Sequence, residues 1–163
     1  MTGINFAELE KQFVRDRINP EFDWRAYDDF SPLNALNVQV SDARTALVTT
    51  AGAHLPDQEP FDIKGMAGDP SFREIPSDVA LEDLELTHRG YDTKLAWEDP
   101  NVVLPLDHLR RARDCGRIGN LSASIYSFMG FVADTDPLVD ASAPEVARRL
   151  RADGTDLVLL APA

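Results

Sequence analysis

Two histidines of this 163-residue sequence stand where short apolar segments end. His54 follows the run at residues 46–50, and His88 follows the alternating segment at residues 84–88, with Asp92 shortly behind it. Imidazole titrates near neutral pH, so either histidine could transfer a proton or bind a substrate carboxylate. Asp92 could orient one imidazole and fix its tautomer. The alternative for each histidine is a structural hydrogen bond to a loop backbone.

A divalent metal is a second possibility at the same residues. If the two strand ends converge, His54, His88 and Asp92 would supply two imidazoles and one carboxylate, a set that suits a divalent cation. The distance between strands cannot be read from one sequence, so no metal is assigned. No nucleotide cofactor is expected, because neither GxGxxG nor GxxxxGK[ST] occurs. GxSxG is also absent, which excludes hydrolases of that type.

Further polar residues could bind the carboxylate of a small substrate. Thr49 and Thr50 end the first apolar run, and Arg73 could form a two-pronged pair with a carboxylate. Asn101 and Ser127 are weaker candidates of the same kind. The alternatives are locally bonded strand hydroxyls for the threonines and a surface ion pair for Arg73.

The pattern of apolar residues predicts the elements that would position these side chains. A compact β-branched run is typical of a buried strand, and ligands bind outside the carboxyl ends of strands in open α/β sheets. Ser142 and Glu145 have the spacing of a capping box, followed by a helix that ends at Gly154. We therefore expect an α/β fold with a Rossmann-like, open, mostly parallel sheet and flanking helices. The expected strands are 44–50, 72–75, 84–88, 118–131 and 155–160, and the expected helices are 5–17, 105–115 and 142–151.

Two segments are predicted along the chain. Residues 1–42 are expected to form an amino-terminal helix followed by an extended aromatic arm, and residues 43–163 a single α/β domain. The arm could contact another subunit or cover the core of its own chain. Residues 55–71 are rich in proline and glycine and predict a long loop, which is typical of functional or mobile segments.

Composition restricts the classes of partner. The chain has 28 acidic and 16 basic residues, a net charge of −12 and a pI near 4.5. Nucleic acids and anionic membranes are disfavoured as partners, because both require a basic surface. The single cysteine, Cys115, cannot form an intramolecular disulfide or a zinc site of paired thiolates. With neither a secretory signal nor a membrane-spanning run in the sequence, we expect a cytoplasmic protein.

Several motifs, taken in order, resemble the glycine/sarcosine/betaine reductase selenoprotein B family, which includes a D-proline reductase subunit. The similarity covers residues 43–162 approximately. Its motifs are ALVTTAGAHL (46–55), EPFD (59–62), GD (68–69), REIPSD (73–78), THRGYD (87–92), NVVLPLDHL (101–109), GRIG (116–119), SFMG (127–130) and DGTDLVLLAP (153–162).

The resemblance implies an α/β subunit that takes part in reductive cleavage of a C–N bond in an amino acid or amine. In relatives a selenocysteine or cysteine lies just beyond the segment that matches residues 156–162, and a histidine stands where His54 does. That redox residue has no counterpart among these 163 residues, and Cys115 belongs to a different motif. Hydroxyl and imidazole groups cannot replace it, because the reaction requires a soft nucleophile that can be reduced again.

Two hypotheses follow. In the first, the protein binds or acts on a small amino-acid-like substrate by acid/base or metal-assisted chemistry without a redox centre, through His54, His88 and Asp92. In the second, it is a non-catalytic accessory subunit of a hetero-oligomer with a longer, cysteine-bearing family member. A homo-oligomer is also possible. The aromatic arm and the exposed edge of the last strand are the expected contact surfaces.

Overall fold

The computed structural model describes residues 4–17, 19–24 and 34–163, and the chain forms two compact units, residues 1–35 and 36–163. Helix α1 (Phe6–Arg17) belongs to the first unit and confirms the predicted amino-terminal helix. Residues 18 and 25–33 of the predicted arm lie outside the described residues, so the arm stays a prediction. The boundary after residue 42 also stays a prediction.

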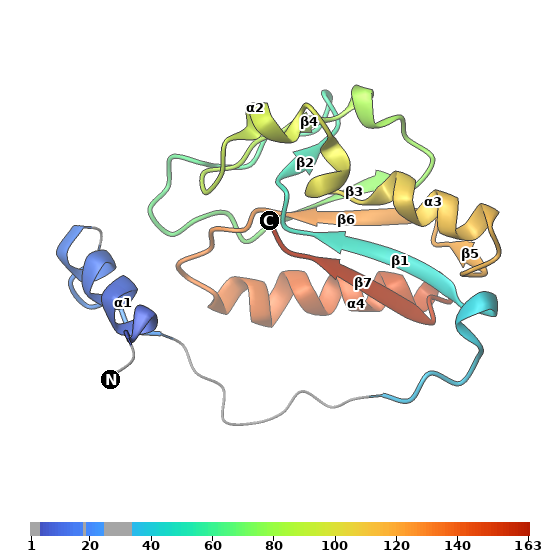
Figure 1. Ribbon diagram of the computed structural model, residues 1–163, viewed down its shortest axis with the longest axis horizontal. Coiled ribbons are helices and arrows are strands. Elements are labelled where there is room, and N and C mark those ends of the chain that lie inside the picture. The colour runs from blue at the N-terminus through green and yellow to red at the C-terminus, as the bar shows by residue number, and fades with distance from the viewer. Residues whose placement is uncertain (1–3, 18, 25–33) are drawn as a thin grey trace. The chain divides into compact units, whose positions relative to one another are not determined.

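Strand β1 (Arg44–Thr49) is the centre of the main sheet in the second unit. It pairs in parallel with β5 (Asn120–Leu121), β6 (Ser124–Phe128) and β7 (Leu157–Ala161). Strand β3 (Phe72–Pro76) pairs with β6 in the antiparallel direction. A separate antiparallel pair is formed by β2 (Ala53–His54) and β4 (Glu85–Leu86). The prediction of an α/β fold with a mostly parallel sheet is confirmed (Figure 1).

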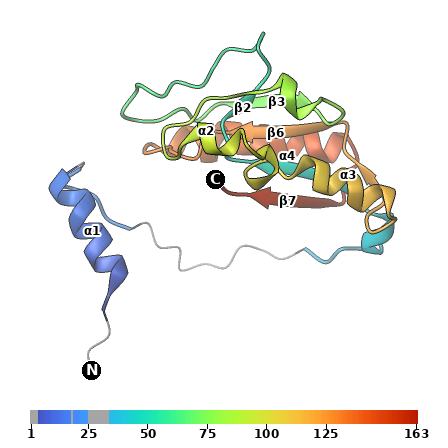
Figure 2. The same ribbon diagram turned by 45° about the horizontal axis from the view of Figure 1, so that its top comes forward.

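Helices cover both faces of this sheet. Helix α3 (Leu106–Asp114) contributes Leu106 and Leu109 to a core with Leu47 and Ile125, and α4 (Ala143–Ala152) buries Val146 and Leu150 against the opposite face. Figure 2 shows the two helices on either side of the strands. The remaining elements are short: η1 (Val40–Asp42), η2 (Leu81–Asp83), α2 (Thr93–Ala96), η3 (Pro100–Val102) and the π-helical turn η4 (Leu138–Ser142).

The predicted capping box at the start of α4 is wrong. Ser142 has helical backbone angles and makes no side-chain capping bond, because the helical path already begins at Leu138. The amide of Ala143 bonds to the carbonyl of Leu138, the wide spacing of a π-turn. Pro144 lacks an N–H and crowds the preceding turn, so a widened turn here is physically reasonable. The predicted end of the helix is confirmed at Gly154, whose φ is +71°.

The carboxyl ends of three parallel strands lie side by side. Thr49 at the end of β1 is in register with Ser127 of β6 and with Ala161 of β7. The predicted strand at residues 118–131 is divided into β5 and β6 by Ser122 and Ala123. The loop predicted at residues 55–71 contains neither helix nor strand. A ligand is expected at this carboxyl edge, since ligands bind outside the carboxyl ends of strands in open α/β sheets.

The last strand is formed as predicted, but it lies at an edge of the sheet. Its side chains at Val158, Leu159 and Leu160 are 37%, 40% and 70% exposed. The apolar run therefore does not mark a strand buried on both faces. Among the described residues, no helix has the length and apolar character needed to cross a membrane.

Candidate functional site

His88 lies at the carboxyl edge of the main sheet, where two backbone amides point at its ring. The amide of Gly90 donates to Nδ1 at 2.8 Å, and the amide of Gly130, just after β6, donates to Nε2 at 3.0 Å. The Tyr91 ring stacks on the imidazole with centroids 4.4 Å apart, and its hydroxyl donates to the Ala51 carbonyl at 2.7 Å. The imidazole is therefore held on three sides.

The protonation of His88 limits which of these bonds can exist together. Burial lowers the pKa of His88 below its usual value of 6.5, so the ring is neutral at pH 7. A neutral imidazole has one N–H and one free lone pair, so it accepts at only one nitrogen. If Nδ1 takes the shorter bond from Gly90, Nε2 carries the proton. An Nε2–H would then face the Gly130 N–H that points at it, so the bonds from Gly90 and Gly130 are alternatives, and the nitrogen that does not accept carries the proton.

Gly130 is a point of close approach. A Cβ at this position would lie 2.6 Å from the carbonyl oxygen of Ala163, 2.7 Å from Nε2 of His88 and 3.3 Å from Oγ1 of Thr50. The hydroxyl of Thr50 also accepts from the amide of Ala163 at 2.8 Å. We call His88, Thr50, Gly130, Tyr91 and Ala163 the carboxyl-edge cluster.

His54 has a different environment, although it also follows a strand. It is 0% exposed, its Nδ1 contacts the carbonyl of Leu55 at 2.9 Å, and its Nε2 contacts the hydroxyl of Thr87 at 2.8 Å. Both ring nitrogens therefore have protein partners. This is the environment expected for a structural histidine that links β2 to the segment beside β4.

Asp92 does not contact either imidazole through its side chain. Its carboxylate accepts from the amide of Lys94 at 3.0 Å and caps α2. Among the residues that the structure describes, no three His, Cys, Asp or Glu side chains are grouped so that they could hold a metal ion. The structure thus brings His88, but neither His54 nor Asp92, into the carboxyl-edge cluster.

The hydroxyls predicted to bind substrate divide into two groups. Thr49 and Ser127 are fully buried: Thr49 donates to the carbonyl of Val103 at 2.7 Å, and Ser127 accepts from the amide of Ala53 at 2.8 Å. Thr50 belongs to the carboxyl-edge cluster. Thr49 and Ser127 support the backbone behind that cluster, whereas Thr50 lies in it.

Arg73 and Asn101 are engaged elsewhere. The guanidinium of Arg73 donates to the carbonyl of Glu59 at 2.6 Å and to the hydroxyl of Ser71 at 2.8 Å, and it lies 4.2 Å from the centroid of the Phe61 ring. These contacts hold the long loop against β3. The side-chain oxygen of Asn101 accepts from the amide of Asp107 at 3.0 Å, at the start of α3.

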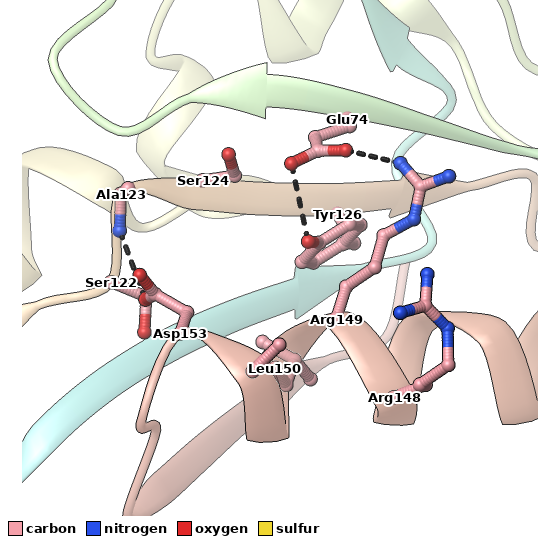
Figure 3. A pocket seen from close by; sticks show the side chains of 10 residues that line it. Glu74, Ser122, Ala123, Ser124, Tyr126, Arg148, Arg149, Leu150 and Asp153 are labelled. Atoms are coloured by element: carbon pink, nitrogen blue, oxygen red, sulfur yellow. Dashed lines mark hydrogen bonds and ion pairs between the residues drawn. The ribbon is translucent and has the colours of Figure 1, made fainter.

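The structure also contains a polar pocket that the sequence analysis missed. It lies between α4 and the β3–β6 pair and has a volume of about 200 Å³ (Figure 3). Glu74 accepts from the hydroxyl of Tyr126 at 3.3 Å and pairs with Arg149, which also contacts Glu145 at 2.7 Å. The residues that line the pocket are Glu74, Ser122, Ala123, Ser124, Tyr126, Arg148, Arg149, Leu150, Ala152 and Asp153.

The charged groups of this pocket largely neutralise one another. Burial, together with the nearby Glu74 carboxylate, raises the pKa of Tyr126 to about 12. Burial alone would raise the pKa of Glu74, but hydrogen bonds from Ser124 and Arg149 outweigh it and lower that pKa. Helical spacing could have indicated the Glu145–Arg149 pair. The contact with Glu74 could not be predicted without the antiparallel pairing of β3.

By its fold this protein is an α/β protein with a mostly parallel sheet, and a histidine and backbone N–H groups lie at the carboxyl edge of that sheet. Its sequence identifies the family. Residues 9–163 match the profile of the glycine/sarcosine/betaine reductase selenoprotein B family, and the chain belongs to that family.

Curated relatives agree with this assignment. The chain is 37% identical over 122 residues to D-proline reductase subunit gamma of Acetoanaerobium sticklandii, covering 75% of this chain and 49% of the relative. It is 31% identical over 161 residues to glycine reductase complex component B subunit gamma of Peptoclostridium acidaminophilum, covering 94% of this chain and 35% of the relative. The chain thus spans half or less of the length of these two relatives. No solved structure shows a significant match.

Proposed function

We propose that this protein binds a small amino-acid-like molecule at the carboxyl-edge cluster, as a component of a reductase system of the selenoprotein B family. The observation that carries the proposal is the His88 imidazole at the carboxyl edge, with the Gly130 amide 3.0 Å from its Nε2 and the Thr50 hydroxyl beside Gly130. When Nδ1 accepts from the Gly90 amide, Nε2 carries the N–H. A ligand carboxylate that replaces the contact between Gly130 and Nε2 would accept from the Gly130 amide and from the Nε2–H.

A site that binds a carboxylate suits the compounds after which the relatives are named. The names of the relatives refer to D-proline, glycine and betaine, each of which carries a carboxylate. In the proposed complex His88 binds the ligand carboxylate and is the acid/base group nearest to it. Thr50 supports the cluster by holding the backbone of Ala163 beside Gly130.

The proposed role of these 163 residues is binding and proton transfer without a redox centre. The one cysteine in the sequence, Cys115, is exposed at the end of α3 and shortly precedes β5. Strand β5 pairs with the beginning of β1, whereas the carboxyl-edge cluster follows the end of β1. Cys115 is therefore not part of the cluster. We also propose that the protein acts in the cytoplasm.

Calorimetric titration of the purified chain with glycine, sarcosine, betaine and D-proline tests the binding proposal. We expect at least one of them to bind. His88→Gln should raise the dissociation constant of the bound compound about 10- to 100-fold, since a hydrogen bond to a charged group contributes about 1.5–3 kcal/mol. His108→Gln, on the exposed side of α3, is the matched control and should bind like the wild type. Absence of binding by all four compounds, or unchanged affinity in His88→Gln, would refute the proposal.

A hetero-oligomeric accessory role is the second candidate. It is favoured by the relatives, whose names describe subunits of multi-subunit complexes. Purification of the tagged chain from its native host, followed by mass spectrometry, would test this role. A stoichiometric, longer family member that contains cysteine or selenocysteine supports it. A chain that purifies without any such member contradicts it.

A further inference from the structure

Arg89 directly follows His88 and is held in place by two contacts. Its Nη1 donates to the carbonyl of Gly65 at 3.3 Å, and its guanidinium carbon lies 5.2 Å from the centroid of the Phe131 ring. Phe131 in turn directly follows Gly130, whose amide points at Nε2 of His88. Arg89 and its aromatic partner thus each adjoin a member of the carboxyl-edge cluster, on two different segments of the chain.

The loop that supplies this carbonyl is fixed beside the segment that contains Phe131. Gly68 of the loop forms a β-bridge with Val132, and a Cβ on Gly68 would lie 2.3 Å from the carbonyl oxygen of Phe131. The carbonyl and the ring that contact Arg89 therefore belong to two segments that are joined to each other. The guanidinium is positioned by both of them.

The guanidinium of Arg89 retains most of its hydrogen-bonding capacity. An arginine side chain has five N–H donors, and in Arg89 a donor on Nη1 is used at Gly65. No Asp or Glu side chain within the described ranges pairs with Arg89. Arg73 is different, because it lies 3.8 Å from the carboxylate of Asp69 and also donates to several backbone carbonyls. Arg89, unlike Arg73, is available to bind an anion.

The carboxyl-edge cluster itself lacks a formal positive charge. The imidazole of His88 is neutral at pH 7 because burial lowers its pKa, and the Thr50 hydroxyl and the Gly130 amide are neutral groups. The net charge of −12 on the chain opposes the approach of an anion. A carboxylate that leaves water for neutral donors alone loses hydration without gaining a charge partner. The proposed ligand therefore requires a cation beside this cluster.

We propose that Arg89 supplies the positive charge for the ligand carboxylate at the carboxyl-edge cluster, and that it makes the site select carboxylates over neutral amides of the same shape. The guanidinium suits this role because it has free donors, two positioning contacts and no acidic partner in the described part of the chain. This inference rests on the proposed function, since it concerns the same ligand. It adds that selection depends on the charge of the carboxylate.

Calorimetric titration with matched pairs of ligands tests this role. Glycine, sarcosine, betaine and D-proline are each compared with the corresponding carboxamide, which keeps the shape but has no negative charge. We expect the wild type to prefer the carboxylate. Arg89→Gln should raise the dissociation constant of the carboxylate about fivefold, the upper end for an ion pair exposed to water, and leave that of the carboxamide unchanged. Arg89→Lys keeps the charge and should retain most of the preference.

Arg117→Gln is the matched control, because it removes the same charge elsewhere. Arg117 is also exposed and also has no acidic partner among residues 4–17, 19–24 and 34–163. It precedes β5, which pairs with the beginning of β1, whereas the carboxyl-edge cluster follows the end of β1. This variant should bind carboxylates like the wild type, and circular dichroism verifies that each variant folds. A loss in Arg117→Gln equal to that in Arg89→Gln would overturn the inference, because net charge alone would explain both.

A purely structural role of Arg89 predicts a different result. If Arg89 only held the long loop, Arg89→Gln would weaken the carboxylate and the carboxamide equally, and this outcome would also overturn the inference.

His88→Gln in the same titrations separates this inference from the proposed function. If His88→Gln weakens binding while Arg89→Gln keeps the full preference for carboxylates, the proposed function stands and the role of Arg89 is wrong. If Arg89→Gln loses the preference but His88→Gln binds like the wild type, the role of Arg89 stands and the proposed function is wrong. If none of the compounds binds to the wild type, both are wrong.

Discussion

Replacement of Gly52 by alanine would test how the backbone positions His88. Gly52 has a φ of +68°, and an added Cβ would lie 2.2 Å from the carbonyl oxygen of Thr87, the residue before His88. Its carbonyl also accepts from the Thr87 amide at 2.9 Å. An alanine here must therefore adopt a left-handed conformation and displace Thr87.

Comparison with a second glycine separates the two contributions to the expected loss of stability, the left-handed conformation and the overpacking. Gly154 has nearly the same φ, +71°, but a Cβ there would meet nothing within 4 Å. Gly154→Ala should lower the free energy of unfolding by the conformational cost alone, about 1–2 kcal/mol. Gly52→Ala adds an overpacking cost of about 1–3 kcal/mol, for a total of about 2–5 kcal/mol. For a chain of this length each kcal/mol lowers Tm by about 2–4 °C.

Thermal and urea unfolding followed by circular dichroism would measure both variants. We expect Gly52→Ala to be the less stable of the two and also to weaken ligand binding, because Thr87 and His88 move together. Equal losses of stability in the two variants would show that the close approach at Thr87 has no energetic consequence, and would refute this account of how His88 is positioned.

Two further predictions concern pH. Burial lowers the folded-state pKa of His88 below 6.5, so the contribution of His88 to stability is present above pH 6.5 and is lost as the pH falls through the folded-state value. Between pH 8 and pH 5 the urea midpoint of His88→Gln should therefore decrease less than that of the wild type. An identical decrease in the two proteins would contradict the assignment. Burial raises the pKa of Tyr91 and of Tyr126 to about 12, so the stability that they contribute is present below pH 10 and is lost as the pH rises through 12. Ultraviolet titration of phenolate in Tyr91→Phe should lose one late-titrating group, whereas loss of a group near pH 10 would be inconsistent with burial.

Local patterns predicted helices α1, α3 and α4 and the parallel strands, because those patterns depend on residues close in sequence. The spacing of Leu106 and Leu109 and the glycine at position 154 were sufficient for α3 and for the end of α4. The antiparallel direction of β3 and the π-turn before α4 were not predicted. Strand direction depends on contacts distant in sequence, and the π-turn begins before the Ser142 that suggested a cap.

The structure brings together only some of the residues that were predicted to form one site, and their function stays a prediction. His88 and Thr50 lie at the carboxyl edge of the sheet. His54 also follows a strand, but β2 pairs with β4 outside the main sheet, and that pairing carries the imidazole into the interior. The two histidines were equivalent in the sequence because the order of residues does not specify which strand belongs to which sheet. Gly130 was missed because a backbone amide has no sequence signal of its own.

Strand β7 links the main sheet to the carboxyl-edge cluster. β7 pairs with β1 along its whole length, and the backbone that follows it is bonded to Thr50 and lies against Gly130. The position of β7 therefore determines how closely Ala163 approaches the His88 imidazole. A strand paired along its length has a fixed register. The pairing of β7 with β1 therefore fixes the register on which the geometry of the carboxyl-edge cluster depends.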